Sequence, residues 1–307
     1  YSAGISFGPS QGRAGDYRLG GDVYVINTGD IHGGVTKADV APGELPSVSG
    51  LDVVSLGSNN EYLAAQAHYN EMFSSYNEIL GSEVYALLDI PKVKLYDTTV
   101  VNDGHIELKD GARGIAVTPF AGDSTAINSG TIIVGDGTSI PQNNFPSASA
   151  GIQQSNFSVN GRGLTASINT ETGIIIAGND AAGIAHFNIG GDSVAINEGS
   201  ISVGNGTSTL VTNFGGESYD RLFLSHGILS IAAAPAMGST SYARNSGEIE
   251  VGDLAAGVFV SGQGFVALDP LAPTAINVNE GIISTGDNSS GMFTLGTNAT
   301  SYNSGSV

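Results

Sequence analysis

Acidic side chains that recur at one position of a repeated motif have the clearest potential for chemistry in this sequence. Each stands eight residues after an asparagine. If the repeats stack in register, their carboxylates form a column with a rise of about 4.8 Å, close enough to share calcium ions. A role in turning the chain without metal is the preferred interpretation, because Asn179 and Asn205 interrupt the column and the calcium-binding pattern Gly-Gly-x-Gly-x-Asp is missing. The four candidate calcium ligands are Asp110, Asp136, Asp253 and Asp287. A second set at another corner is Asp22, Asp123 and Asp192.

Other patterns with chemical meaning are weaker. Gly4-Ile-Ser-Phe-Gly8 has the form of a nucleophile elbow, but that motif needs a strand-to-helix turn in an α/β sheet, which the surrounding sequence does not predict. No His-x-x-x-His or His-Glu pair is recognised at ligand spacing, so no zinc site is expected. The histidines are His32, His68, His105, His186 and His226. We therefore expect no catalytic residue, no bound cofactor other than possible calcium, and a protein that is not an enzyme.

The stretch from Thr274 to Met292 shows the repeat that must position these side chains. It has the skeleton Asn-x-Gly-x-(Ile/Val)-x-x-Gly-(Asp/Asn)-x-x-x-Gly-(Ile/Val/Met). Three steps between successive opening asparagines are 26, 28 and 24 residues, and the others are 75, 41, 48 and 34, as insertions into a basic unit would produce. The opening residues are Asn27, Asn102, Asn128, Asn169, Asn197, Asn245, Asn279 and Asn303.

Each unit predicts short strands separated by turns. Residues 131–134, 200–203 and 248–251 alternate with period two, are rich in β-branched side chains, and end at Gly-Asp or Gly-Asn. Offsets that repeat over 200 residues favour a solenoid over a sandwich or barrel. We expect one domain over residues 1–307, an all-β parallel solenoid of about 25 residues and three strands per coil. Its stacked asparagines should form a hydrogen-bonded ladder. Its interior rows should include Ile132, Ile201, Ile249 and Ile283.

Four insertions interrupt the repeat. Residues 58–81 combine a capping box, tyrosines every seven residues and a closing glycine, which predicts a helix over about 59–80. It should dock on the solenoid, or else bind a partner. Residues 137–150, 207–226 and 261–274 are polar and aromatic and are expected to be loops, either solvated or carrying binding specificity.

Composition narrows the class of protein. The net charge is −19, from 29 acidic and 10 basic residues, so nucleic acid is not an expected partner. The chain has no cysteine and no apolar run long enough for a transmembrane helix. It begins at Tyr1 and ends inside a repeat, which we interpret as a removed leader or an excerpt of a longer protein.

Two units, residues 243–258 and 276–292, resemble the passenger repeats of bacterial autotransporters. The resemblance covers residues 100–307 and, more weakly, 21–35. It implies a right-handed parallel β-helix in an extracellular or outer-membrane-surface location. Three functions compete: an adhesin or stalk that binds a cell-surface protein or glycan, a filament subunit that binds copies of itself, and a glycan-processing enzyme on the same scaffold.

Overall fold

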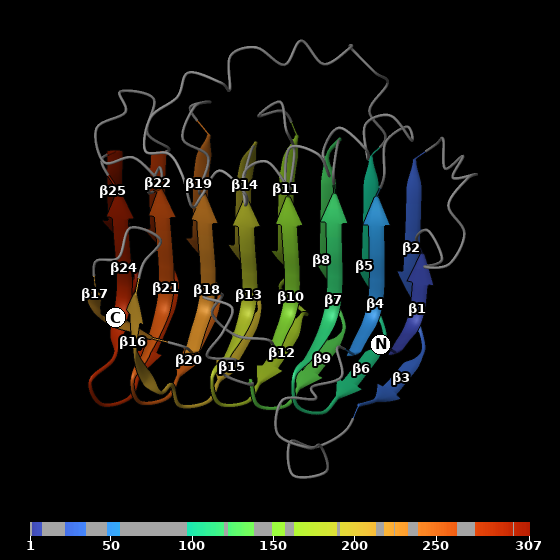
Figure 1. Ribbon diagram of the computed structural model, residues 1–307, viewed down its shortest axis with the longest axis horizontal. Coiled ribbons are helices and arrows are strands. Elements are labelled where there is room, and N and C mark those ends of the chain that lie inside the picture. The colour runs from blue at the N-terminus through green and yellow to red at the C-terminus, as the bar shows by residue number, and fades with distance from the viewer. Residues whose placement is uncertain are drawn as a thin grey trace.

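The computed structural model describes residues 2–7, 22–34, 48–55, 97–119, 122–137, 149–156, 163–188, 191–212, 218–223, 225–232, 239–262, 274–296 and 298–307. Within these ranges the chain is built from β-strands, with no helix. Three parallel sheets of eight, eight and seven strands make up the body of the molecule. The chain visits sheets A, B and C in turn and then begins the next coil, so each sheet gains one strand per coil (Figure 1). This confirms the predicted parallel β-helix.

Strand bounds follow the repeat along the sequence. Sheet A contains β1 (Ser2–Phe7), β4 (Val48–Ser55), β7 (Ala112–Pro119), β10 (Ser149–Asn156), β13 (Ala181–Asn188), β18 (Ser225–Ala232), β21 (Ala255–Gly262) and β24 (Ser290–Gly296). Sheet B contains β2 (Val23–Asn27), β5 (Thr98–Asn102), β8 (Ser124–Asn128), β11 (Leu164–Asn169), β14 (Asp192–Asn197), β19 (Thr240–Asn245), β22 (Thr274–Asn279) and β25 (Asn298–Asn303). Sheet C contains β3 (Asp30–Gly33), β6 (His105–Leu108), β9 (Thr131–Val134), β12 (Ile174–Ala177), β15 (Ser200–Val203), β20 (Glu248–Val251) and β23 (Ile282–Thr285).

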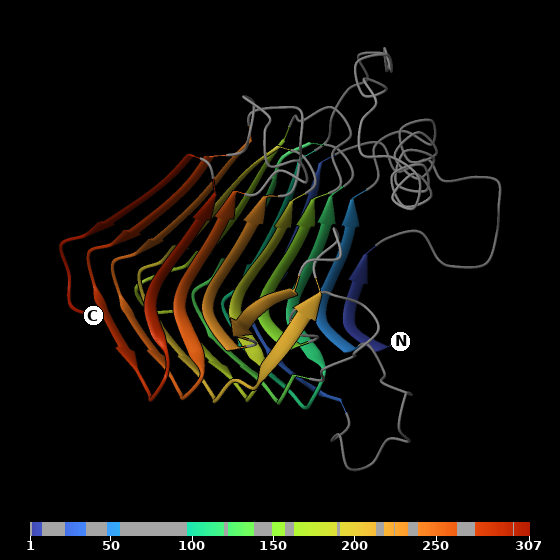
Figure 2. The ribbon, with the colours of Figure 1, turned by 60° about the vertical axis from the view of Figure 1, so that its left-hand side comes forward.

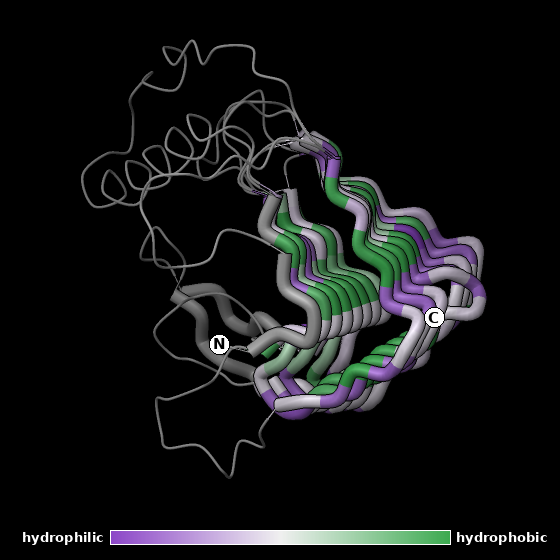
Figure 3. The backbone as a smooth tube through the Cα atoms, turned by 90° about the vertical axis from the view of Figure 1, so that its right-hand side faces the viewer, coloured by the Kyte–Doolittle hydropathy of each residue, from purple (hydrophilic) through white to green (hydrophobic). Residues whose placement is uncertain are grey.

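The interior is a set of rows in which like residues stack from coil to coil (Figure 3). On sheet C the central inward position is always isoleucine. Ile31 in β3, the terminal strand, is partly buried, and in every strand from β6 to β23 the isoleucine is at most 2% exposed. Burial of this row removes apolar surface from water at about 25 cal/mol per Å², and only neighbouring coils can provide that cover. The row consists of Ile106, Ile132, Ile175, Ile201, Ile249 and Ile283.

A glycine column on sheet A faces the isoleucine row. A Cβ at Gly183 would lie 2.6 Å from the carbonyl oxygen of Gly227 and would also clash with the Ile201 side chain. The same two obstacles recur in most coils, which explains why glycine returns twelve residues after several opening asparagines. The column includes Gly50, Gly114, Gly151, Gly183, Gly227 and Gly257.

The insertions do not all have the expected form. Within 207–226 the structure contains an antiparallel pair, β16 (Ser208–Thr212) with β17 (Ser218–Phe223), so the expectation of a loop there is wrong. The pair lies outside the solenoid, over sheet A (Figure 2). Of 137–150 and 261–274, the described residues are Gly137 and the ends of β10, β21 and β22. The predicted helix at 58–81 lies outside the described residues.

Candidate functional site

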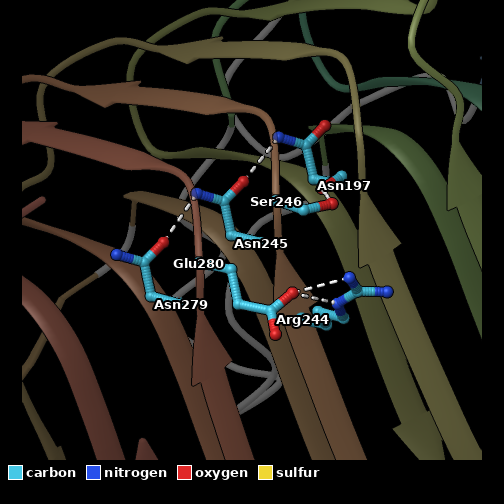
Figure 4. A network of polar contacts seen from close by, with 6 residues as sticks. All are labelled: Asn197, Arg244, Asn245, Ser246, Asn279 and Glu280. Atoms are coloured by element: carbon cyan, nitrogen blue, oxygen red, sulfur yellow. Dashed lines mark hydrogen bonds and ion pairs between the residues drawn. The ribbon is translucent and has the colours of Figure 1, made fainter. Parts of the chain in front are cut away.

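The opening asparagines form one continuous ladder at the end of sheet B. In each rung the Nδ2 of one asparagine donates to the Oδ1 of the next, over 2.8 to 2.9 Å (Figure 4). Interior rungs also satisfy backbone carbonyls: Asn169 Nδ2 donates to Gly173 O and to Ser200 O. The side chains from Asn102 to Asn279 are fully buried. The ladder therefore joins coils, and its interior amides are shielded from solvent.

The predicted calcium column has a structural role that the structure makes explicit. Asp110 Oδ1 accepts a hydrogen bond from the backbone N–H of Asp136, and Asp136 Oδ1 accepts one from the N–H of Asn179, at 2.9 and 2.8 Å. The chain of bonds continues through Asn179, Asn205 and Asp253 to the N–H of Asp287. Because asparagine also has an Oδ1 acceptor at the same position of its side chain, it substitutes at this corner without breaking the column. The pattern caps backbone N–H groups that the turn leaves unpaired.

A second column of the same kind lies at the corner before sheet B. Asp22 Oδ1 accepts from the N–H of Asp97, Asp97 from Asp123, and Asp123 from Leu164. Asp192 Oδ1 likewise accepts from the N–H of Thr240 at 2.7 Å. Both acidic columns are therefore occupied by backbone capping. Within the described ranges, neither column gathers three ligand atoms into one metal-sized cluster.

Sequence reasoning missed a polar seam buried between sheets A and B. Gln154 Nε2 donates to Ser167 Oγ at 2.8 Å, and Ser167 Oγ lies 2.6 Å from His186 Nε2. One coil further, Ser230 Oγ lies 3.0 Å from Ser193 Oγ and 2.7 Å from Ser241 Oγ. The sequence does contain a signal for this seam. At one inward position of sheet A, strands β10, β13 and β18 carry the polar residues Gln154, His186 and Ser230.

Ser167 and His186 have the contact expected of a nucleophile and its base, but their burial rules out that role. Both side chains are 0% exposed, so no substrate reaches them. Burial lowers the pKa of His186 to about 3, which keeps the imidazole neutral. The pair is a buried internal contact in which Nε2 of His186 is bonded and Nδ1 has no hydrogen-bond partner among the described residues. Ser6, the candidate nucleophile of the elbow motif, lies in β1, which pairs in parallel with β4.

The outer face of sheet A is also buried. Ala116, Ala185, Leu229 and Phe259 point away from the isoleucine row and are 7% exposed or less. Asp52 lies on this sheet, where burial raises the pKa of its carboxyl and the nearby Arg113 partly offsets that rise. This face is therefore not a free surface.

The outer face of sheet B is different, because most of its outward side chains are at least partly exposed and its two central rows carry a single charged residue, Arg244. One outward position of each strand carries a branched aliphatic residue, an arginine or a tyrosine, and these residues stack in register. We call this set the sheet B row: Ile26, Val101, Ile127, Ile168, Ile196, Arg244, Val278 and Tyr302. The second outward position carries Tyr24, Thr99, Thr125, Ala166, Val194, Tyr242, Ile276 and Thr300. Arg244 is paired with Glu280 at 2.6 Å (Figure 4), and that hydrogen bond raises the pKa of the guanidinium.

The outer face of sheet C brings together three side chains that sequence analysis did not group. His32, His105 and Glu107 place their ligand atoms within 4.8 Å of one another. The statement that no His-Glu pair stands at ligand spacing is wrong. His-x-x-x-His is the spacing of ligands on one face of a helix, whereas on a strand residues i and i+2 share a face, which places His105 beside Glu107.

Comparison with protein-family models, curated proteins and solved structures finds no significant match for this chain. In the part of the chain that the structure describes, no helix has the length and apolarity needed to cross a membrane.

Proposed function

We propose that this protein is an extracellular structural and adhesive β-solenoid of a bacterial surface protein, and that it self-associates through the outer face of sheet B. The observation that carries the proposal is the sheet B row. Ile26 and Tyr302 are 43% and 57% exposed, and Ile127, Ile168 and Ile196 between them are partly exposed. Val101 in the same row is buried and Arg244 interrupts it, so the exposed apolar run lies over β8, β11 and β14. An exposed apolar patch on a water-facing sheet is typical of an interaction surface.

The absence of acidic residues from the two central rows makes this face suited to a second copy of the chain. The molecule carries 29 acidic residues, yet none occupies the sixteen outward positions of sheet B named above. Acidic residues lie at the edges of the sheet instead: Asp192 is the exposed first residue of β14, and Glu280, which follows β22, is paired with Arg244. Two copies can therefore bring the central rows together with the carboxylates at the rim. By contrast, the outward positions of sheet C carry Asp30, Glu107, Glu248 and Glu250. The distribution of charge supports sheet B, rather than sheet C, as the proposed contact face.

The residues that recur in the repeat support a structural role. The asparagine ladder and both aspartate columns bind the protein's own backbone, so the repeated polar groups hold coils together. A rigid body with an uncharged lateral face suits clustering of neighbouring molecules on a cell surface. The resemblance to autotransporter passenger repeats agrees with such a location.

Substitution of the row tests the proposal. Changing Ile127, Ile168 and Ile196 to threonine keeps β-branched side chains and removes most of the apolar surface, and threonine already occupies the neighbouring outward position at Thr99 and Thr125. The matched control is Ile133, Ile174 and Ile176 changed to threonine on sheet C. Circular dichroism and thermal unfolding first establish that both triple variants fold.

Sedimentation over a range of concentrations should show that the unsubstituted protein and the sheet C variant self-associate with similar affinity. The affinity of self-association should be at least tenfold weaker in the sheet B variant. Autoaggregation of beads that carry the protein should follow the same order. A protein that stays monomeric at high concentration, or association that both variants weaken equally, overturns the proposal. Electron microscopy distinguishes lateral clusters from end-to-end filaments, and filaments would favour the alternative of a stacking subunit.

A further inference from the structure

We propose that strands β3 and β6 carry a binding site for one divalent transition-metal ion of the zinc class. The ligands are Nδ1 of His32, Nε2 of His105 and the carboxylate of Glu107. His32 Nδ1 lies 3.3 Å and His105 Nε2 lies 3.7 Å from the same oxygen, Glu107 Oε2. The two imidazole rings are adjacent, with centroids 5.5 Å apart and planes tilted by 54°. This site is independent of the sheet B contact face.

The solenoid fixes these three side chains on one surface. Ile31 and Ile106 point inward in β3 and β6, so the flanking residues point outward by the two-residue alternation of strands. The parallel register pairs His32 with Glu107 and Asp30 with His105. Backbone pairing therefore sets the spacing of the ligands before any ion binds.

The spacing matches a zinc-type coordination sphere. Zinc lies about 2.0 to 2.1 Å from histidine nitrogen and carboxylate oxygen, so two ligands of a tetrahedral site are about 3.4 Å apart. The 3.3 Å separation of His32 Nδ1 and Glu107 Oε2 meets this value, and the 3.7 Å separation needs only a small rotation of His105. His32 and Glu107 are 58% and 56% exposed along their side chains, which leaves room for water at a fourth position.

The donor set selects the class of metal. Imidazole nitrogen favours zinc, copper, nickel and related ions, whereas calcium and magnesium prefer oxygen ligands. The carboxylates of Glu107 and the adjacent Asp30 also contribute negative charge that a divalent ion balances. This combination is absent from the aspartate columns, whose oxygens accept backbone hydrogen bonds.

A bound ion would join the first two coils. His32 belongs to β3, the terminal strand of sheet C, and the other two ligands belong to β6, the next strand in that sheet. The two histidine ligands, His32 and His105, are 73 residues apart in sequence. Because the folded site binds metal and the unfolded chain does not gather these residues, metal should stabilise the packing of β3 on β6.

Competition with a chromophoric chelator, using zinc in the presence of millimolar calcium, tests the site. Excess calcium occupies sites made of oxygen ligands alone, so zinc that stays bound to the protein reports ligation by imidazole. The test variant is His32→Asn with His105→Asn. The control is Glu250→Gln, because Glu250 occupies the same outward row as Glu107 but lies beside Ser202 and Ser284.

The unsubstituted protein and the control should bind one zinc ion per chain, and the double histidine variant should bind at least 100-fold more weakly. Copper added at one equivalent should give an electron paramagnetic resonance spectrum with nitrogen hyperfine splitting in the unsubstituted protein and in Glu250→Gln. The double histidine variant should lack that splitting. Zinc should raise the Tm of the unsubstituted protein and of Glu250→Gln, and should leave the Tm of the double histidine variant unchanged. Equal zinc affinity in all three proteins, or a Tm that zinc leaves unchanged, overturns the proposal. Equal Tm values in chelator establish that the variant folds.

Discussion

The side chain of Asn197 donates a hydrogen bond of 2.8 Å to the side chain of Asn245, although 48 residues separate them. Asn169 donates to Asn197 over the same distance across only 28 residues. The 20 additional residues between Asn197 and Asn245, among them β16 and β17, leave the rung unchanged. The corner is therefore set by the stacked backbone, and the insertion is accommodated outside it.

Removal of an interior rung should be costly. Asn197→Ala eliminates the Nδ2 donor that also bonds the carbonyls of Gly199 and Glu248, and it leaves Asn245 Oδ1 buried without its donor. Because each buried polar group left unpaired costs about 1 to 3 kcal/mol, we expect a loss of about 3 kcal/mol in the free energy of unfolding. Urea unfolding measures it.

The exposed last rung provides the control for that experiment. Asn303 accepts from Asn279 at the solvent-facing end of the ladder, so Asn303→Ala should cost less than about 1 kcal/mol. Equal losses at the two positions would show that the ladder does not act through burial.

The glycine column makes a second prediction. Gly183→Ala drives a methyl group against the Gly227 carbonyl and the Ile201 side chain, and overpacking of this kind costs about 1 to 3 kcal/mol. Gly29→Ala is the matched control, since a Cβ there meets no atom within 4 Å. We expect thermal unfolding to show a Tm drop of several degrees for Gly183→Ala and almost none for Gly29→Ala. A tolerated Gly183→Ala contradicts the tight contact between sheets A and C.

The repeat made the fold predictable, because period-two strands, glycine-containing turns and a buried amide each leave a residue-level signature. The conformation of the turn was not predicted in detail: positive φ occurs at Gly111, Asp180, Leu254 and Asn288, one residue after the corner Asp or Asn at which the turn was expected. The hairpin of β16 and β17 had no such signature, since it occurs once. Insertions are governed by local pairing, which a comparison between repeats does not reveal.

The candidate sites were less accessible to sequence reasoning for a related reason. His32 lies beside Glu107 only because parallel pairing joins positions 75 residues apart. The register follows from the ladder, in which Asn27 bonds Asn102 across the same 75 residues. Applying that offset to every residue of β3 would have found the cluster.

The aspartate column predicts a clear difference between two substitutions of one residue. Asp136→Asn keeps an Oδ1 acceptor for the N–H of Asn179, as Asn179 itself does for Asn205, so stability should change by less than about 0.5 kcal/mol. Asp136→Ala removes the acceptor and should cost about 1 kcal/mol. Urea unfolding compares the two.

Calcium removal complements that comparison. If backbone capping is the role of the column, a calcium chelator leaves the Tm unchanged. A Tm that calcium raises in the unsubstituted protein but not in Asp136→Asn would instead establish a calcium site at this corner.

His186 predicts how stability depends on pH. Its pKa is about 3 in the folded state because of burial, against about 6.5 in the unfolded chain, so between these values the unfolded chain binds a proton that the folded state excludes. Above pH 6.5 the histidine is neutral in both states and does not affect the pH dependence of stability. Below it, the free energy of unfolding falls by about 1.4 kcal/mol per pH unit as the pH decreases toward 3.

His186→Gln should remove this slope, because Gln154 occupies the same inward position one coil earlier and bonds Ser167. Unfolding of both proteins by urea at pH 7.5 and pH 4.5 measures the difference, which should favour the glutamine variant by about 2 to 3 kcal/mol at the lower pH relative to the higher. Burial of Asp52 raises its pKa and gives a slope of opposite sign, but that slope is common to both proteins and cancels in the comparison. An identical pH dependence in the two proteins would show that His186 is protonated in the folded state.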